Sequence, residues 1–231
     1  MIITKLIAKP DTSGGGGVIY DEHDNMTLSS NSLKVSPKNP FNDPNLYSIY
    51  KQENVQEIIT YTCKKNIEKD FTISSWVYLT GAFMTYAFIS TGHNLGADVN
   101  FCWQLVNNGN DGYSGIWSDR KWQILLNSIP LNKWVYVTCV NHNNNLTVYY
   151  DGKKQGSMNY NKSLEIDQGG NIFSINEDNV YKRGIYGYIF DFFISNKAEW
   201  TSDFIPPNTS FDDHSSLYLD NDKNIWGCSK L

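Results

Sequence analysis

Apolar and aromatic side chains recur in short runs along this chain, and turn-forming residues separate the runs. Asn, Asp, Gly and Ser cluster between the runs, while aromatic and β-branched residues fill them. Runs of this kind are typical of β-strands, whose pleated surface packs such side chains well. The clearest predicted strands span residues 71–79, 84–89, 101–106, 117–126, 134–140, 146–151, 185–194 and 216–219.

The best predicted hairpin joins residues 134–140 to residues 146–150 through a loop over 141–145. In its second strand, Leu146 and Val148 alternate with side chains for the opposite face, which is the period of a half-buried strand. Asp151-Gly152 follows directly and favours a second tight turn.

The pattern predicts an all-β fold made of two stacked antiparallel sheets, a β-sandwich. No segment longer than ten residues holds a 3.6-residue apolar period, and the best helical candidate, residues 50–60, suits a strand equally well. Four glycines at 14–17 predict a hinge. Residues 1–17 are therefore expected to form an N-terminal arm or an edge strand, followed by a single sandwich over residues 18–231.

Charge and hydropathy exclude two classes of partner. The net charge is -5 and no run of Lys or Arg exceeds two, so a nucleic-acid partner is not expected. No stretch approaches the roughly 18 apolar residues of a membrane span. The opening residues MIITKLIAKP do not resemble a secretion signal, so we expect synthesis in the cytoplasm without classical secretion.

The four cysteines are widely spaced and form no C-x-x-C pair; they are Cys63, Cys102, Cys139 and Cys228. Buried free thiols are the expectation, with one long-range disulfide left open. A zinc site is not expected, because the four histidines show no ligand spacing with these thiols.

Three blocks of sequence, taken in order, resemble the laminin-G/concanavalin A-like lectin/glucanase superfamily. The first is FTISSWVY at 71–78; the second is NKWVYVT at 132–138 with LTVYYDG at 146–152; the third is GYIFDFFIS at 187–195 with WTSDFIPP at 200–207. The third block is similar to domains of phage and viral structural proteins. The resemblance implies a jelly-roll, concanavalin A-like sandwich.

The third block also departs from the family pattern. Phe190 and Phe193 stand where the family has an Asp and an Arg. The resemblance therefore implies the fold without implying a particular ligand.

No catalytic residues are expected. Glycosidases of this fold use paired carboxylates in an E-x-D-x-x-E arrangement, and Glu165 and Asp167 begin it, but Gly170 occupies the last position. Without the second Glu the pair lacks its proton donor. No G-x-S-x-G motif occurs, and the histidines fall in polar loops. A divergent glycoside hydrolase or lyase remains the alternative.

Calcium is the cofactor that many members of this superfamily carry, bound by oxygen ligands of loops. The candidate ligands are Asp98 and Asn100, followed by Asp111 and Asp119. Asn and Asp also serve metal-free turns, which every loop of this chain could use.

The segment over residues 107–121 is the candidate glycan site. It combines aromatic rings, which stack on sugars, with amide and charged groups that meet hydroxyls. The predicted ligand-binding residues are Asn110, Asp111, Tyr113, Trp117, Asp119 and Arg120. The alternative places Trp117 and Trp122 in the core, where Trp76 and Trp134 are also expected.

These observations predict a non-catalytic recognition or structural module. We expect a component of a virion or other surface assembly, such as a fibre, appendage or capsid decoration, with host glycans as candidate ligands. A purely architectural protein without a ligand is a further alternative. Other assembly proteins are the expected partners, and a homo-oligomer is left open.

Overall fold

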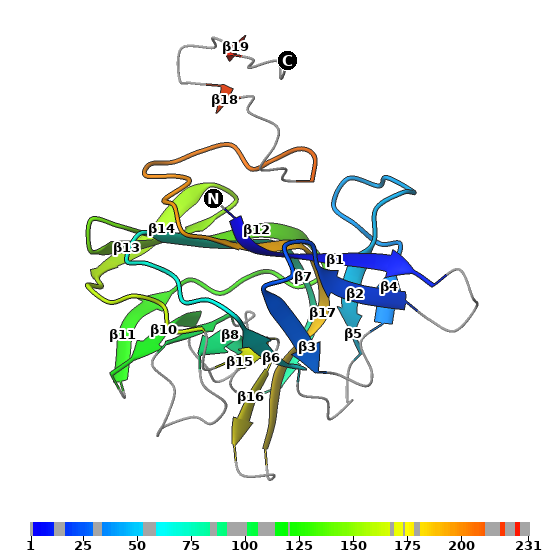
Figure 1. Cartoon of the computed structure of the whole chain (residues 1–231), viewed down its shortest axis with the longest axis horizontal. Coiled ribbons are helices and arrows are strands. Elements are labelled where there is room, and N and C mark those ends of the chain that lie inside the picture. Colours follow the sequence, from blue (N-terminus) through cyan, green and yellow to red (C-terminus); the bar gives the residue numbers. More distant parts are fainter. Residues whose placement is uncertain are drawn as a thin grey trace.

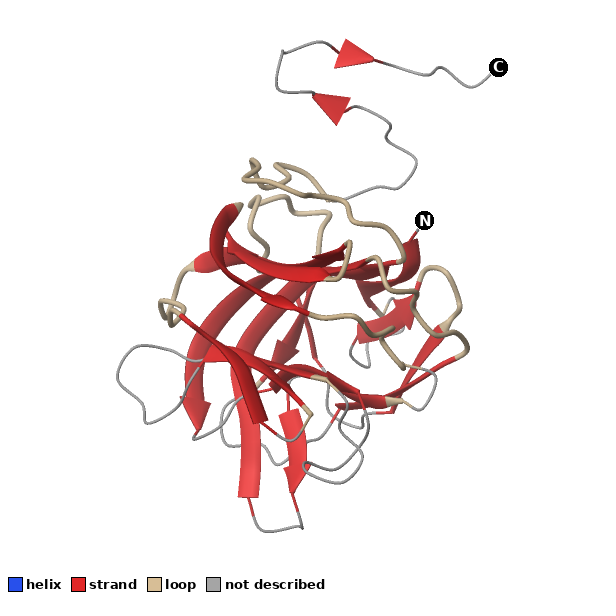
Figure 2. Cartoon of the chain, turned by 90° about the vertical axis from the view of Figure 1, so that its left-hand side faces the viewer, coloured by secondary structure: helices blue, strands red, loops and turns tan. Residues whose placement is uncertain are grey.

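The computed structural model describes residues 2–11, 17–29, 34–52, 59–83, 87–91, 101–105, 114–119, 121–166, 169–172, 174–177, 181–210, 218–219 and 225–226. Within these ranges the chain forms strands, turns and loops without a helix. Two antiparallel sheets face each other across an apolar core (Figures 1 and 2), which confirms the predicted all-β sandwich. No helix in the described part of the chain is long and apolar enough to cross a membrane.

The larger sheet has ten strands. They are β1 (Ile2–Pro10), β2 (Gly17–Asp21), β4 (Lys34–Ser36), β5 (Ser48–Lys51), β7 (Phe71–Phe83), β12 (Trp134–His142), β13 (Asn145–Tyr150), β14 (Lys153–Asn159), β16 (Ser174–Glu177) and β17 (Tyr181–Ser195). The main order is β14-β13-β12-β7-β17-β1-β2, while β5 and β16 also pair with β17, and β4 pairs with β5.

The smaller sheet has seven strands. They are β3 (Met26–Ser29), β6 (Ile59–Cys63), β8 (Ala87–Thr91), β9 (Cys102–Gln104), β10 (Ser114–Ser118), β11 (Lys121–Leu126) and β15 (Gly170–Ile172). Their order is β11-β10-β9-β8-β15-β6-β3. A separate pair joins β18 (Tyr218–Leu219) to β19 (Ile225–Trp226).

The core lies between the inner faces of the two sheets. Ile73 and Val77 of β7 contribute from the larger sheet, and Trp103 of β9 contributes from the smaller one. Phe88 meets the edge of the Trp103 ring with centroids 5.2 Å apart. Full burial of each such side chain stabilises the fold by about 1.5–3 kcal/mol.

The predicted hairpin is confirmed, with a tighter loop than expected. Strands β12 and β13 continue to His142 and Asn145, so only Asn143 and Asn144 form the turn. Both residues have positive φ, at 51° and 62°, which suits the twist of a two-residue hairpin. The predicted turn at Asp151-Gly152 is also present.

Two details of the sequence interpretation are wrong. Residues 117–126 form two strands, because the chain reverses at Asp119, whose φ is 52°, and Trp117 then pairs with Trp122. Trp76 and Trp134 are only partly buried, since they lie on the outer face of the larger sheet, away from the core.

The first strand is part of the larger sheet. Residues Ile2 to Lys5 of β1 pair with β17, and residues Leu6 to Pro10 pair with β2. Buried Asp21 at the end of β2 accepts the Lys5 N–H at 2.7 Å, which ties the two strands together.

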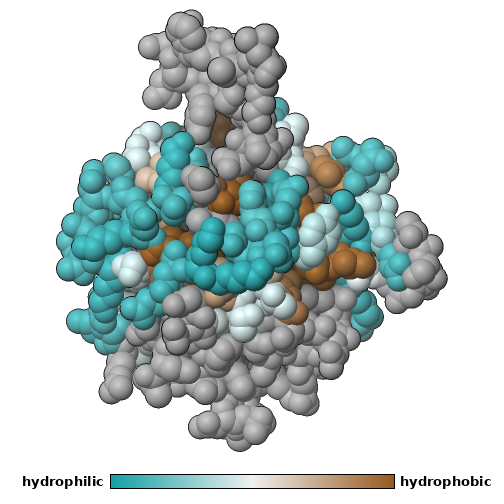
Figure 3. Space-filling model, in the orientation of Figure 1, coloured by the Kyte–Doolittle hydropathy of each residue, from teal (hydrophilic) through white to brown (hydrophobic). Residues whose placement is uncertain are grey.

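Two segments cover the outer face of the larger sheet. The 37–47 loop, between β4 and β5, rises above the sheet on the right of Figure 1, and the 196–210 segment crosses above it in orange. Within the 196–210 segment, Trp200 stacks on Phe204 at 4.4 Å. In Figure 3, apolar residues are visible between polar ones on the described part of the surface.

Candidate functional site

Four aromatic side chains form one row across the outer face of the larger sheet. The strand register pairs Tyr50 with Tyr188, Tyr188 with Tyr78, and Tyr78 with Trp134. Directly opposed residues of antiparallel strands place their side chains on the same face. The neighbouring positions, such as Val77 and others in the core, point inward. We call Tyr50, Tyr188, Tyr78 and Trp134 the aromatic row.

The rings of the aromatic row contact one another. Tyr50 and Tyr188 stack with centroids 4.6 Å apart. Tyr78 presents an edge contact to Tyr188 at 5.7 Å and to Trp134 at 5.5 Å. Three strand spacings give the row a length of about 14 Å. All four side chains are partly exposed, so the row is a ready surface for a ligand.

A second row beside it is covered. Phe190, Trp76 and Tyr136 are also paired across the strands. Phe41 of the 37–47 loop meets Phe190 and Trp76 at ring distances of 5.6 and 5.9 Å, and Trp200 meets Tyr136 at 6.0 Å. The two covering segments therefore bury Tyr136 and Phe190, partly cover Trp76, and leave the aromatic row accessible.

Two lysines flank the aromatic row. Lys38 Nζ lies 3.2 Å from the ring centroid of Tyr78 and 4.8 Å from that of Tyr188. Such cation–π contacts contribute about 0.5–1 kcal/mol at exposed sites. At the Tyr50 end of the row, Lys34 of β4 is directly opposite Tyr50 in the strand register. The aromatic row thus has one positive charge near its middle and another at its Tyr50 end.

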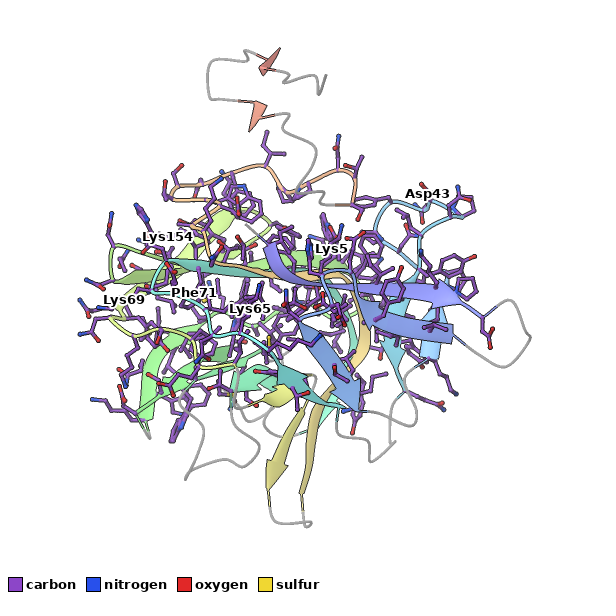
Figure 4. The ribbon with its side chains drawn as sticks, in the orientation of Figure 1. Lys5, Asp43, Lys65, Lys69, Phe71 and Lys154 are labelled. Atoms are coloured by element: carbon purple, nitrogen blue, oxygen red, sulfur yellow. The ribbon has the colours of Figure 1, made fainter. Side chains whose placement is uncertain are left out.

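The position of Lys38 follows from the hydrogen bonds of the buried Asn39 side chain. Asn39 Nδ2 donates to the carbonyl oxygens of Pro37, Asp43 and Leu46 at 3.0, 2.7 and 3.0 Å. Its Oδ1 accepts the N–H of Asp43 at 3.2 Å. The Asn39 side chain therefore fixes the conformation of the 37–47 loop, in which Asp43 is labelled in Figure 4. The fixed loop in turn holds Lys38 over the aromatic row.

Burial changes the ionisation of Tyr188, at the centre of the aromatic row. It raises the pKa of Tyr188 above its ordinary value, and the neighbouring Tyr50 and Tyr78 raise the pKa further. The Tyr188 hydroxyl therefore stays neutral near pH 7, able to donate and to accept a hydrogen bond.

Only part of the predicted glycan site falls in the described residues. Trp117 lies on the outer face of the smaller sheet in an edge contact with Trp122 at 5.7 Å, and its buried indole N–H has no hydrogen-bond partner among the described residues. The Asp119 carboxylate forms an ion pair with Lys162. The other predicted residues lie outside the described residues: Asn110, Asp111, Tyr113 and Arg120.

The aromatic row was missed from the sequence, although a signal for it exists. Three predicted strands contain two aromatics separated by one residue, at 76 and 78, at 134 and 136, and at 188 and 190. This spacing places both rings of each strand on one face. The pairing of the three strands with one another, which aligns the rings, is not visible in the sequence.

The predicted calcium ligands Asp98, Asn100 and Asp111 lie outside the described residues. In the described ranges, no three His, Cys, Asp or Glu side chains gather closely enough to hold a metal ion. Of the carboxylate motif, Glu165 is exposed on a loop and Asp167 is outside the described residues.

The fold and the site together define an antiparallel β-sandwich with an aromatic surface on its larger sheet. A model of the concanavalin A-like lectin/glucanases superfamily matches residues 55–200. The chain belongs to this superfamily, as the three sequence blocks predicted. No curated protein matches the chain as a whole or in part.

Solved structures share the fold at low sequence identity. One is domain 4 of AbnA, an extracellular arabinanase from Geobacillus stearothermophilus in complex with arabinotriose, with 16% identity, a TM-score of 0.53, and coverage of 83% of this chain and 92% of that one. The binding domain of Paraclostridial Mosquitocidal Protein 1 has 16% identity, a TM-score of 0.54, and coverage of 85% and 49%. Trypanosoma rangeli sialidase with the inhibitor DANA has 10% identity, a TM-score of 0.57, and coverage of 85% and 31%.

Proposed function

We propose that this protein is a non-catalytic carbohydrate-recognition module that binds a glycan chain along the aromatic row. The observation that carries the proposal is the row itself: four contacting rings, partly exposed, on a rigid sheet. Aromatic faces and edges match the apolar C–H surface of a sugar, and the phenol hydroxyls can meet sugar hydroxyls. The length of about 14 Å fits a short oligosaccharide.

The structural neighbours support this proposal. Domain 4 of the arabinanase, which this chain covers almost completely, was solved with arabinotriose. A second neighbour is a toxin binding domain. Both supply examples of this sandwich in a recognition role.

The surroundings of Gly170 support the absence of catalysis. A Cβ atom at position 170 would lie 2.0 Å from the Ser90 carbonyl oxygen and 2.7 Å from the Tyr61 hydroxyl. No side chain fits there, so the position that carries the second Glu in glycosidases of this fold could not hold one. Reducing ends released from a glycan panel, and lost in Glu165→Gln, would contradict this part of the proposal.

The aromatic row can be tested by substitution. Trp134→Ala and Tyr50→Ala should each weaken binding to immobilised polysaccharides at least tenfold, because each removes one stacking surface. Trp122→Ala on the smaller sheet and Tyr20→Ala on β2 are matched controls that should bind as the unaltered chain does. Loss of binding in Trp122→Ala but not in Trp134→Ala would place the glycan at the 107–121 segment instead and overturn the assignment to the row.

The proposal includes a place in a virion or other surface assembly. The similarity of residues 187–207 to domains of viral structural proteins supports it. Copurification of the chain with particles from its native source is the expected result, and a chain found only free would contradict this part.

A further inference from the structure

The two lysines beside the aromatic row indicate the chemistry of its ligand. Lys38 Nζ is held over the rings of Tyr78 and Tyr188, and no described carboxylate lies within ion-pair distance of it. Lys34 Nζ donates to the neutral Gln52 amide oxygen at 3.0 Å. Among the described residues, neither ammonium group has a carboxylate partner next to the aromatic row.

Two other lysines of the molecule illustrate the usual pairing of a lysine with a carboxylate. Lys64 pairs with Asp24 at 2.8 Å, and Lys153 pairs with Asp203 at 3.3 Å. Lys38 is partly buried and has no carboxylate partner among the described residues, so the carboxylate of a ligand can supply the anion. Lys38 is placed to receive one.

Lys38 is not needed to hold its own loop. The side chain of Asn39 already bonds the backbone of Pro37, Phe41, Asp43 and Leu46. Phe41 also anchors the loop on Trp76. The loop conformation thus sets the position of the Lys38 ammonium group. Because the loop does not depend on that group, its charge is available to an anionic ligand.

We propose, on the basis of the proposed function, that the glycan on the aromatic row is a carboxylated polysaccharide. A sugar ring rests on the row, and the carboxylate of that sugar or its neighbour binds Lys38, with Lys34 meeting a further carboxylate along the chain. The whole protein carries a net charge of -5 and therefore does not attract a polyanion as a whole. The attraction for the carboxylates of the glycan comes from these two lysines. An ion pair of this kind also orients the chain along the row.

The test compares matched acidic and neutral ligands. Polygalacturonate, alginate and hyaluronan are each paired with their carboxyl-reduced derivatives, which keep the backbone and lose the charge. The unaltered protein should bind at least one acidic member at least tenfold more tightly than its reduced partner. Raising the salt concentration should weaken that preference.

Substitution of Lys38 separates this inference from the proposed function. Lys38→Met keeps the apolar stem and should abolish the acidic preference while retaining binding to the reduced polysaccharide; Lys38→Arg should retain the preference. Lys64→Met is the control for charge alone and should behave as the unaltered protein. Urea denaturation of each variant confirms folding.

Three outcomes would overturn parts of this picture. An acidic preference that survives Lys38→Met removes the role of Lys38. Tighter binding of dextran sulfate, which carries sulfate and no carboxylate, than of all three carboxylated polysaccharides assigns the site to sulfate. The proposed function itself is overturned if no polysaccharide, acidic or reduced, binds the unaltered protein.

Discussion

A buried ion pair stands out among the residue-level interactions. Lys5 Nζ lies 3.4 Å from Asp191 Oδ1, with side-chain exposures of 7% and 1%. Ser210 donates to the same carboxylate oxygen at 2.9 Å. Lys5 is labelled on β1 in Figure 4. Three distant parts of the chain therefore meet at one carboxylate, two of them in the sheet and one in the 196–210 segment.

Removal of this carboxylate charge should destabilise the protein. Asp191→Asn removes the buried carboxylate partner of Lys5 and leaves Glu22, at 3.9 Å, as a more distant and more exposed one, so we expect a loss of about 3 kcal/mol in the free energy of unfolding. Asp24→Asn is the matched control: Asp191 and Asp24 both have positive φ, at 57° and 54°, but the pair of Asp24 with Lys64 is exposed. Urea denaturation measures both, and equal effects would contradict the role of burial.

At the same scale, the departures from the family pattern have a packing explanation. Phe190 is covered by Phe41, and Phe193 contacts Trp200 at 6.3 Å. The two phenylalanines thus pack against the two segments that cover the outer face of the larger sheet. The sequence showed the substitutions, but their partners lie far away in the chain.

At the scale of elements, the turn between β13 and β14 holds the 196–210 segment. The Phe204 N–H donates to the Gly152 carbonyl at 3.0 Å, and the Lys154 N–H donates to Asp203 Oδ1 at 3.0 Å. Gly152 has a φ of +71°, and a Cβ atom there would lie 1.9 Å from the Phe204 carbonyl oxygen. This turn therefore requires glycine for both its conformation and its contact.

Gly152→Ala should loosen the segment before it affects the rest of the sandwich. We expect the 196–210 segment to be cleaved by protease at least several-fold faster, because the added methyl group pushes Phe204 away. Gly156→Ala on β14 is the control: its Cβ would meet side chains alone, the tip of Ile124 at 2.6 Å and Leu126 Cδ2 at 3.3 Å, and both tips can rotate. Equal cleavage rates in the two variants would contradict this role of Gly152.

At the scale of the whole molecule, the core keeps several ionisable groups neutral. Burial raises the pKa of the Cys102 thiol from 9.0 to about 12, and it raises the pKa values of Cys139, Tyr61, Tyr150 and Tyr160 as well. Cys63, Cys102 and Cys139 are free and buried, as expected, and Cys228 lies outside the described residues.

These raised pKa values predict loss of stability at high pH. Below pH 9 each group is protonated in both states and stability is intact. Above that, the unfolded chain loses protons that the folded chain keeps, so stability falls, for Cys102 between about pH 9 and about pH 12. Urea denaturation at pH 8, 9, 10 and 11 measures this. Cys102→Ala should make the fall shallower by up to about 1.4 kcal/mol per pH unit; a stability that is constant across this range would contradict the prediction.

The local structure of this protein could be predicted from its amino-acid sequence. Alternation over residues 134–150, the Asp151-Gly152 turn and the three family blocks predicted strands, a hairpin and the sandwich, because these signals act between near neighbours in the chain. Which face each strand buries, and which strands distant in the sequence pair with each other, followed from the folded arrangement of the two sheets. The aromatic row exists because β5, β17, β7 and β12 pair in one register, and it stays accessible because Phe41 and Trp200 cover the row beside it. Contacts between residues so far apart in the chain leave no mark in its local pattern.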